Sequence, residues 1–227
     1  MGKAKLKKFQ DINQFSNVFQ NTDWHKPVCI NHCGENISIK GNWRKQLFKN
    51  ENDIVLELAC GKGEYSVELA QTYPNINFIG IDIKGNRIWN GAKKALELKL
   101  PNVHFLRTNI ELLAHFFDEK EINHIWITFP DPHLRGVKSQ KRLTSERFLN
   151  IYKPLLKTEA TINLKTDSEP LYDFTKLTIN KLHLNLISDI ADIYEQQNYP
   201  KVLNIKTYYE KMHLANGLKI FYLKFGF

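Results

Sequence analysis

Short apolar runs alternate, from residue 53 onward, with segments whose apolar side chains recur every three or four positions. Because that spacing places side chains on one helical face, the segments between the apolar runs are expected to be helices. Strands that alternate with helices along a chain predict an α/β fold with a doubly wound, mostly parallel sheet. The pattern predicts seven strands, at residues 53–58, 77–82, 103–106, 125–129, 160–165, 186–193 and 218–225.

The expected helices lie between these strands. Ser168-Glu169-Pro170 marks a helix start, since serine is a good N-cap and proline fits the first turn. Thr207 and Glu210 have the spacing of a capping box, which predicts a turn or helix between the last two strands. The other expected helices lie near residues 64–72, 87–99, 110–117 and 148–155.

Residues 1–50 lack this alternation, and we interpret them as an N-terminal extension of a main domain at 51–227. Aromatic side chains are scattered through the extension without a clear period, so we expect them to pack against the main domain. Residues 1–8 hold four lysines and are expected to form a solvated arm. Residues 40–45 are expected to open a helix before the first strand.

The first strand runs into a glycine turn, Gly61-Lys62-Gly63, and a helix is expected directly after the turn. A strand, a tight glycine turn and a helix together present backbone N–H groups to a nucleotide. Two acids accompany the turn, Glu57 in the first strand and Asp82 at the end of the second. A carboxylate at the end of the second strand is placed to accept hydrogen bonds from both ribose hydroxyls. The sequence therefore predicts a nucleotide site at this turn.

Polar residues also follow the later strands. Asn109 comes after the third strand, and Asp131 follows the fourth strand between Pro130 and Pro132. Two prolines around an acid fix a rigid, non-helical loop. Asp167 lies at the end of the fifth strand. Because ligands bind at the carboxyl ends of the strands in an open α/β sheet, all three polar residues are candidates for the site.

The charge of the chain suggests an anionic partner. The formal net charge is +8, and a basic cluster follows the proline loop. Positive charge attracts nucleic acid, although it also serves solubility alone. The basic cluster consists of Arg135, Lys138, Lys141, Arg142 and Arg147.

Three cysteines in 227 residues fit a reducing cytoplasm. A zinc site could be drawn from Cys29, Cys33, His25 and His32, but the spacing of the two cysteines is not that of a zinc knuckle, so no metal is expected. No apolar run approaches the roughly 18 residues of a membrane span. There is no signal peptide pattern either. We therefore expect a cytoplasmic protein without a membrane partner.

Five short motifs resemble, in order and spacing, those of the bacterial tRNA (guanine-N7)-methyltransferases. They are Glu57-Leu-Ala-Cys-Gly61-Lys-Gly63-Glu-Tyr65, Ile81-Asp82, Phe129-Pro-Asp-Pro132, Leu164-Lys-Thr-Asp167 and Thr207-Tyr-Tyr-Glu210. The glycine turn alone is unspecific, whereas the proline loop, the strand-end acid and the late threonine-to-glutamate motif together are specific. The resemblance covers about residues 50–225 and implies a class I, Rossmann-like methyltransferase fold.

The resemblance also implies S-adenosylmethionine as methyl donor and the variable-loop guanosine of tRNA as acceptor. The family treats the residue at Asp131 as active, which implies a catalytic role here. The implied donor contacts are Glu57, Gly61, Gly63, Asp82, Asn109 and Asp131. The implied RNA contacts are Arg135, Asp167, Thr207, Tyr208, Tyr209 and Glu210. The resemblance leaves the choice between a monomer and a homodimer open.

Two positions depart from the family's usual pattern. The proline loop continues His133-Leu134-Arg135 where Trp-Pro is usual, and the basic cluster after it is thinner. Asn109 stands where an acid is commoner. An amide oxygen can still accept a hydrogen bond from an adenine amino group, so Asn109 should retain donor binding. The thinner basic cluster is the departure that has more effect on the expected RNA affinity.

Other functions remain open at this stage. The chain could methylate another RNA or a small molecule, or it could be a non-catalytic RNA-binding protein that keeps the fold. A nicotinamide oxidoreductase is disfavoured, because its G-x-G-x-x-G pattern would need glycine where Ser66 stands. The +8 charge argues against a small-molecule substrate.

Overall fold

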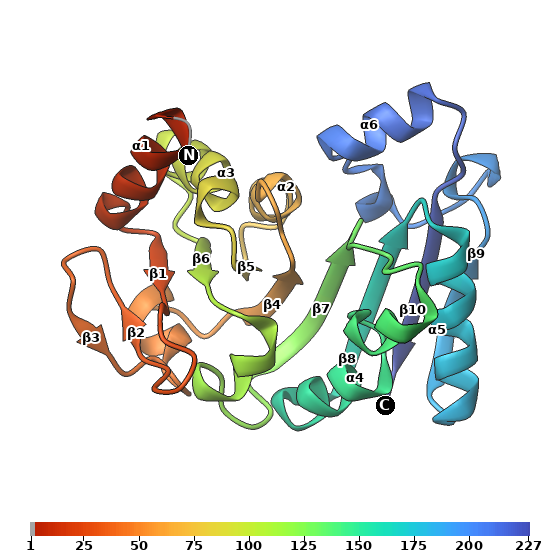
Figure 1. Ribbon diagram of the computed structural model, residues 1–227, viewed down its shortest axis with the longest axis horizontal. Helices are drawn as coiled ribbons and strands as arrows, with labels where there is room; N and C mark the ends of the chain where they lie inside the picture. Colours follow the sequence, from red (N-terminus) through yellow and green to blue (C-terminus); the bar gives the residue numbers. More distant parts are fainter. Residues whose placement is uncertain (1–2) are drawn as a thin grey trace.

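The computed structural model describes residues 3–227 and contains one ten-stranded sheet with helices on both faces (Figure 1). The strand order across the sheet is β3-β2-β1-β6-β5-β4-β7-β8-β10-β9. The strands are β1 (Val18–Gln20), β2 (Cys29–Ile30), β3 (Asn36–Ile37), β4 (Asp53–Leu58), β5 (Ile76–Asp82), β6 (Val103–Arg107), β7 (Ile122–Thr128), β8 (Leu156–Thr166), β9 (Asn185–Ile190) and β10 (Phe221–Gly226).

The α/β fold class is confirmed, but the sheet is larger than the seven strands expected. Strands β1, β6, β5, β4, β7 and β8 are parallel, and β10 runs antiparallel to both β8 and β9. The three additional strands, β1 to β3, come from residues 18–37 and continue the sheet beyond β6. Each has only two or three residues, too few for an alternating pattern to register in the sequence.

The segment expected to be a lysine arm is helical where the structure describes it, with Lys5 and Lys7 exposed to solvent; residues 1–2 lie outside the described residues. Residues Lys3–Asp11 form helix α1, which lies against α3 (Gly85–Glu97), as Figure 1 shows. The Lys8 ammonium lies 4.3 Å from the centre of the Trp89 ring, and the indole N–H of Trp89 donates to Asp11 at 2.9 Å. The division of the chain into an extension and a main domain at residue 50 stays a prediction.

The expected helices are present. They are α2 (Glu64–Thr72), α3, α4 (Glu146–Tyr152), α5 (Glu169–Lys181) and α6 (Tyr208–Ala215). Residues 110–115 form a 3-10 helix, and residues 43–48 form a short π-helix before β4. Ser168 is the N-cap of α5, since its hydroxyl accepts from the Leu171 N–H.

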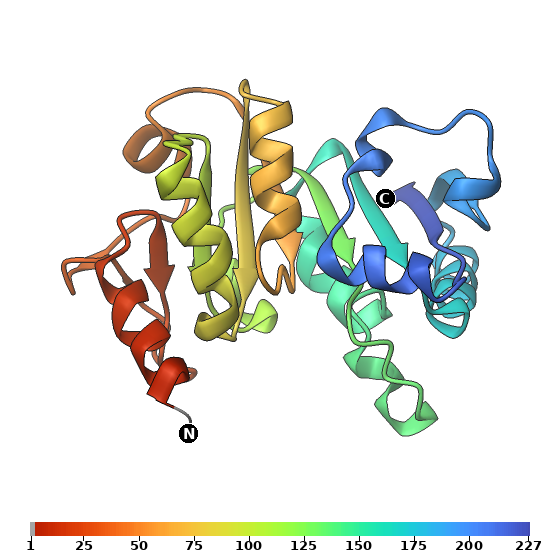
Figure 2. The same ribbon diagram turned by 90° about the horizontal axis from the view of Figure 1, so that it is seen from above.

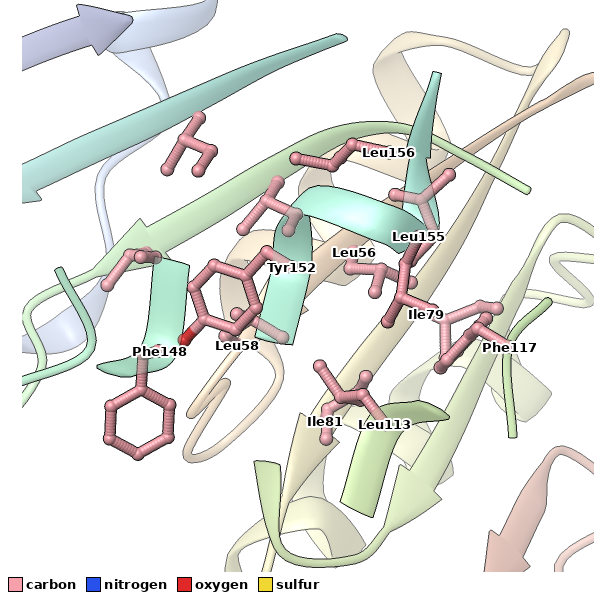
Figure 3. Packing of buried hydrophobic residues seen from close by; sticks show 14 of the residues in the cluster. Leu56, Leu58, Ile79, Ile81, Leu113, Phe117, Phe148, Tyr152, Leu155 and Leu156 are labelled. Atoms are coloured by element: carbon pink, nitrogen blue, oxygen red, sulfur yellow. The ribbon is translucent and has the colours of Figure 1, made fainter. Parts of the chain in front are cut away.

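The core consists of two layers, one on each face of the sheet. Leu56 and Leu58 of β4 lie in one layer with Tyr152 of α4, as Figure 3 shows, whereas Val55 lies in the other with Ile88 of α3. Successive side chains of a strand point to opposite faces, so β4 contributes to both layers. This near-continuous apolar character is what a central parallel strand requires.

Trp43 anchors the segment before β4 in the core. Its side chain is buried, stacks on Phe117 with ring centroids 5.2 Å apart, and donates to the carbonyl of Phe116 at 2.8 Å. In the part of the chain that the structure describes, no helix has the length and apolarity needed to cross a membrane.

Candidate functional site

The glycine turn between β4 and α2 adopts the left-handed conformation at three positions. The φ angles of Ala59, Gly61 and Gly63 are 54°, 55° and 67°. A Cβ atom at Gly63 would lie 2.5 Å from a ring carbon of Phe105. A side chain at Gly63 would therefore be strained by its backbone and would clash with β6. The backbone passes close to the sheet here because residue 63 is glycine.

Asp82 fixes this turn from the neighbouring strand. Its side chain is 7% exposed, and its carboxylate accepts from the backbone N–H of Gly61 at 2.9 Å and of Lys84 at 2.7 Å. Each carboxylate oxygen can accept a further hydrogen bond, since a carboxylate has about four acceptor positions. Asp82 therefore orders the turn and keeps acceptor capacity for a ligand.

Glu57 is 3% exposed and is held by three hydrogen bonds. It accepts from the backbone N–H of Ser66 at 2.9 Å, from the Ser66 hydroxyl, and from the Thr128 hydroxyl at 2.7 Å. Burial raises the pKa of Glu57 to about 7. Ser66 and Thr128 are not recognisable as site residues from the sequence, because their hydroxyls approach Glu57 only when α2 and β7 are in place.

Two pockets meet at Ala59, at the carboxyl ends of the parallel strands. We call the first the reaction pocket; it is lined by Glu57, Ala59, Cys60, Gly61, Lys62, Glu64, Arg87, Thr128, Phe129, Thr207 and Tyr209. We call the second the apolar pocket; it is lined by Ala59, Asp82, Ile83, Thr108, Asn109, Ile110, Glu111, Leu143 and Phe148. The structure thus brings the predicted residues Glu57, Gly61, Asp82, Asn109, Thr207 and Tyr209 together.

Asp131 lies near this edge but lines neither pocket. Of its side chain, 74% is exposed, and its carboxylate accepts from the backbone N–H of His133 at 3.0 Å. The loop before it is shaped by Phe129, whose φ is 47° and whose N–H donates to the carbonyl of Lys165 at 2.8 Å. The backbone of the proline loop is therefore attached to the sheet, while the carboxylate of Asp131 remains open to solvent.

The basic cluster divides into one buried and several exposed cations. Arg142, expected as part of the charged surface, is 8% exposed, and its guanidinium donates to the carbonyls of Pro132 and His133 at 3.0 and 3.3 Å. Arg135 and Lys141 are exposed on the segment between β7 and α4, which projects from the body of the molecule in Figure 2. Arg142 thus stabilises the base of the loop, and the exposed Arg135 and Lys141 lie farther along it.

A buried ion pair holds α6 on the sheet. Lys165 and Glu210 have side chains with 0% exposure, and the ammonium lies 2.7 Å from one carboxylate oxygen and 2.9 Å from the other. The ammonium also donates to the carbonyls of Leu203 and Ile205, and the Tyr194 hydroxyl donates to Glu210 at 2.6 Å. Burial lowers the pKa of Lys165.

This arrangement bears on the predicted RNA contact of Glu210. Its side chain is 0% exposed and both of its oxygens bind groups inside the protein, so a direct contact with a base would require the residues around Glu210 to move. Thr207 caps α6 by accepting from the Glu210 N–H at 3.2 Å, as the capping-box pattern predicts. Lys165 was not among the predicted site residues, although a lysine inside an apolar strand is a sign of a buried ion pair.

Of the other predicted RNA contacts, Thr207 and Tyr209 line the reaction pocket. Tyr208 and Tyr209 are exposed at the start of α6, and the Lys62 ammonium lies 4.1 Å from the centre of the Tyr208 ring. Asp167 lies at the end of β8, with a carboxylate oxygen 3.5 Å from the ring nitrogen of His213. Asp167 and Arg135 line neither of the two pockets.

The two cysteines near the N-terminus lie in different environments. Cys29 is buried in the core, whereas Cys33 is exposed. Among residues 3–227, no group of three histidine, cysteine, aspartate or glutamate side chains is placed to hold a metal ion.

Comparison with solved structures supports the fold. The chain is similar to a 16S rRNA methyltransferase, KamB, with a TM-score of 0.62 and 14% identity over 84% of this chain and 94% of that one. It is also similar to an antibiotic-related methyltransferase, with a TM-score of 0.60 and 17% identity over 85% of this chain and 96% of that one. At these identities the likeness concerns the fold.

Sequence comparisons are more specific. Residues 51–223 match a family model described as "Putative methyltransferase". The chain is 44% identical to the tRNA (guanine-N(7)-)-methyltransferase of Christiangramia forsetii, over 98% of this chain and 97% of that protein. It is 44% identical to the protein of that name in Bacteroides fragilis (99% and 86% covered) and 49% identical to that in Porphyromonas gingivalis (83% and 77% covered). The chain therefore belongs to the tRNA (guanine-N(7)-)-methyltransferase family.

Proposed function

We propose that this chain transfers a methyl group from S-adenosylmethionine to N7 of a guanosine in tRNA, and that this guanosine lies in the variable loop. The observation that carries the proposal is the 44% identity to a protein named tRNA (guanine-N(7)-)-methyltransferase, which extends over nearly the full length of both chains. The two pockets at the carboxyl edge of the sheet support it independently.

The donor site is suited to S-adenosylmethionine, because its polarity matches the molecule part by part. Leu143 and Phe148 line the apolar pocket and would contact the adenine ring, and Asn109 would accept a hydrogen bond from the adenine amino group. Asp82 would bind the two ribose hydroxyls. The reaction pocket, with Glu57 and the Gly61 backbone, would hold the charged methionine end.

Guanine N7 carries a free lone pair, so no protein base has to activate it. The bound donor supplies a methyl group on a sulfonium, and the product purine is cationic. The protein has to align the base with the donor and exclude water from the reaction pocket. Phe129 and Tyr209 give that pocket its aromatic lining.

Asp131 would act by its charge. A carboxylate near the purine favours the cationic product and can hold the purine edge. Its exposure leaves it free to contact RNA, and His133 fixes its position through the backbone hydrogen bond. Asp167 would accept from the N1–H and amino groups of guanine, which adenine does not present in the same way.

We further propose that the enzyme works in the cytoplasm, without a bound metal, as a monomer or a homodimer. The three cysteines of the chain are free thiols, in keeping with a reducing compartment. A Lewis acid has no necessary part in methyl transfer to a free lone pair.

Mass spectrometry of nucleosides tests the proposal. Unmodified tRNA incubated with the protein and isotope-labelled S-adenosylmethionine should yield labelled 7-methylguanosine, and nuclease mapping should place it in the variable loop. A tRNA with adenosine at that position is the matched control and should take up no label there. Label in another nucleoside, or none in any tRNA, would contradict the assignment.

A further inference from the structure

A lysine-rich groove lies next to the reaction pocket, along α2, α3 and the start of α6. In Figure 1, α2 lies between α3 and α6. We call this the lysine groove; it is lined by Lys62, Glu64, Glu68, Asn90, Gly91, Lys94, Lys206, Tyr208 and Lys211. Neither the donor contacts nor the basic cluster after Asp131 uses it, apart from its border with the reaction pocket.

The groove has an excess of positive charge, because four lysines and two glutamates line it and give a formal net charge of +2. Glu68 lies 2.8 Å from the Lys94 ammonium, whereas Glu64 accepts from the neutral Tyr208 N–H at 2.7 Å. Within residues 3–227, no carboxylate oxygen lies within 4.0 Å of the other three lysine ammonium groups. These three are Lys62, Lys206 and Lys211.

Lys62 joins the groove to the reaction pocket. It is the residue between the two glycines of the turn, and both Lys62 and Glu64 line the two cavities. The Lys62 ammonium lies over the exposed ring of Tyr208, so its charge is directed toward α6. A polymer strand that leaves the reaction pocket on the side of Lys62 would enter the lysine groove directly.

A single RNA strand has the matching chemistry. It carries one negative charge per nucleotide, which lysine ammonium groups neutralise, and bases that stack on exposed aromatic rings. The groove offers both kinds of contact, whereas an acidic peptide would make no use of the exposed Tyr208 ring. Arg135, Lys138 and Lys141, the exposed cations between β7 and α4 (Figure 2), lie on a different segment, so they do not cover this side of the pocket.

We propose that the lysine groove binds the phosphate backbone of the RNA strand on one side of the target guanosine, with Lys62, Lys206 and Lys211 as its phosphate contacts. This proposal rests on the proposed function, because it assumes that the guanine enters the reaction pocket. It extends the RNA contacts expected at the start of α6, where Tyr208 lies, onto α2 and α3.

The test compares two double variants that remove the same charge. Lys206→Ala with Lys211→Ala removes two exposed lysines of the groove. Lys45→Ala with Lys120→Ala is the control, because both lysines are exposed and precede β4 and β7 at the opposite edge of the sheet. Binding of tRNA is measured as Kd at several salt concentrations, with donor binding and thermal unfolding measured alongside.

The groove variant should bind tRNA more weakly, and the slope of log Kd against log salt should fall by about 1.4, since a single-strand phosphate contact contributes about 0.7. The control should keep the wild-type slope, and both variants should keep donor affinity. Hydroxyl-radical footprinting should show that the groove variant loses backbone protection on one side of the target guanosine and keeps it elsewhere.

The outcomes separate the two proposals. If wild-type protein methylates tRNA but the groove and control variants have equal salt slopes, the groove proposal is wrong and the proposed function stands. If the groove variant loses protection evenly along the tRNA, the groove does not bind the strand next to the target. If wild-type protein neither binds nor methylates tRNA, the proposed function itself is wrong.

Discussion

The proposed donor side and the proposed acceptor side of the site differ in how their acids are held. Glu57 and Asp82, on the donor side, are 3% and 7% exposed and accept three and two hydrogen bonds from the protein. Asp131, on the acceptor side, is 74% exposed, and within the described residues its side-chain contacts are with His133. The two buried acids are thus fixed by protein groups, whereas the carboxylate of Asp131 remains open to solvent.

The difference follows from where each acid comes from. Glu57 and Asp82 lie in central parallel strands, which are covered on both faces, so their carboxylates must be paired with protein groups. Asp131 lies on a loop, where backbone and carboxylate can reach solvent. Helix α6, which carries the predicted RNA contacts Tyr208 and Tyr209, is attached to the sheet by the ion pair of Lys165 and Glu210.

The largest change in unfolding free energy is expected at the buried ion pair that attaches α6 to the sheet. Lys165→Ala leaves Glu210 as an unpaired buried charge, and the loss of one partner of a buried pair costs about 3–5 kcal/mol of unfolding free energy. Urea unfolding measures the change. Lys176→Ala is the control, because it breaks a partly exposed pair with Asp189 and should cost about 0–1 kcal/mol. Equal losses in both variants would contradict a stabilising role for the buried pair.

The next largest effect is the pH dependence of stability that the buried Glu57 should cause. Because burial raises the pKa of Glu57 from 4.5 to about 7, the folded state keeps a proton that the unfolded state loses between these values. Stability should therefore fall as pH rises from 4.5 to about 7, by up to about 3 kcal/mol. Glu57→Gln removes this contribution, so its unfolding free energy should vary less with pH in that window. Parallel pH profiles for the two proteins would exclude the raised pKa.

Substitution of Asp82 should lower the affinity for the methyl donor without changing tRNA binding. Asp82→Ala removes the acceptor for both ribose hydroxyls and for the Gly61 N–H, and hydrogen bonds to charged groups contribute about 1.5–3 kcal/mol. Donor affinity should fall about 10- to 150-fold by calorimetry, with the fold retained. Unchanged donor affinity would show that Asp82 orders the turn without binding the ribose.

Asp131 tests whether an exposed carboxylate takes part in the reaction. Asp131→Asn keeps the size of the side chain but removes its charge, and kcat should fall about tenfold, equivalent to about 1.4 kcal/mol, with smaller changes in either KM. Wild-type kcat should be nearly flat from about pH 6.5 to 8.5, since N7 needs no deprotonation. A steep rise through neutrality that disappears in Asp131→Asn would show a general base instead. A change confined to donor affinity would show that Asp131 only binds the donor.

The smallest changes in activity are expected for the exposed cations of the segment between β7 and α4. Arg135→Ala with Lys141→Ala should raise the KM for tRNA and lower the salt slope of binding by about 1.4, with donor binding unchanged. Arg142→Ala is a contrasting variant, because its buried guanidinium bonds to Pro132 and His133 and should affect loop order more than the salt slope. A double variant with the wild-type slope would remove Arg135 and Lys141 from the phosphate contacts.

The sequence alone predicts the central strands and the glycine turn, because these signals are local. The apolar run of β4, the turn at Gly61 and Gly63, and the acid that ends β5 are each specified within a few residues of chain. The capping box of Thr207 and Glu210 is local as well, and the structure contains it. Such patterns depend on backbone sterics and on side-chain period, which neighbouring residues determine.

Tertiary structure decided the features that join distant parts of the chain. Strand β1 pairs with β6 across more than eighty residues, and the ammonium of Lys165 meets a carboxylate that α6 brings to it. Arg142 reads as surface charge in the sequence, yet it is buried because carbonyls of the proline loop face it. A charged or short polar segment has no local signal for such a partner, since the partner exists only after the sheet has formed and brought the two segments together.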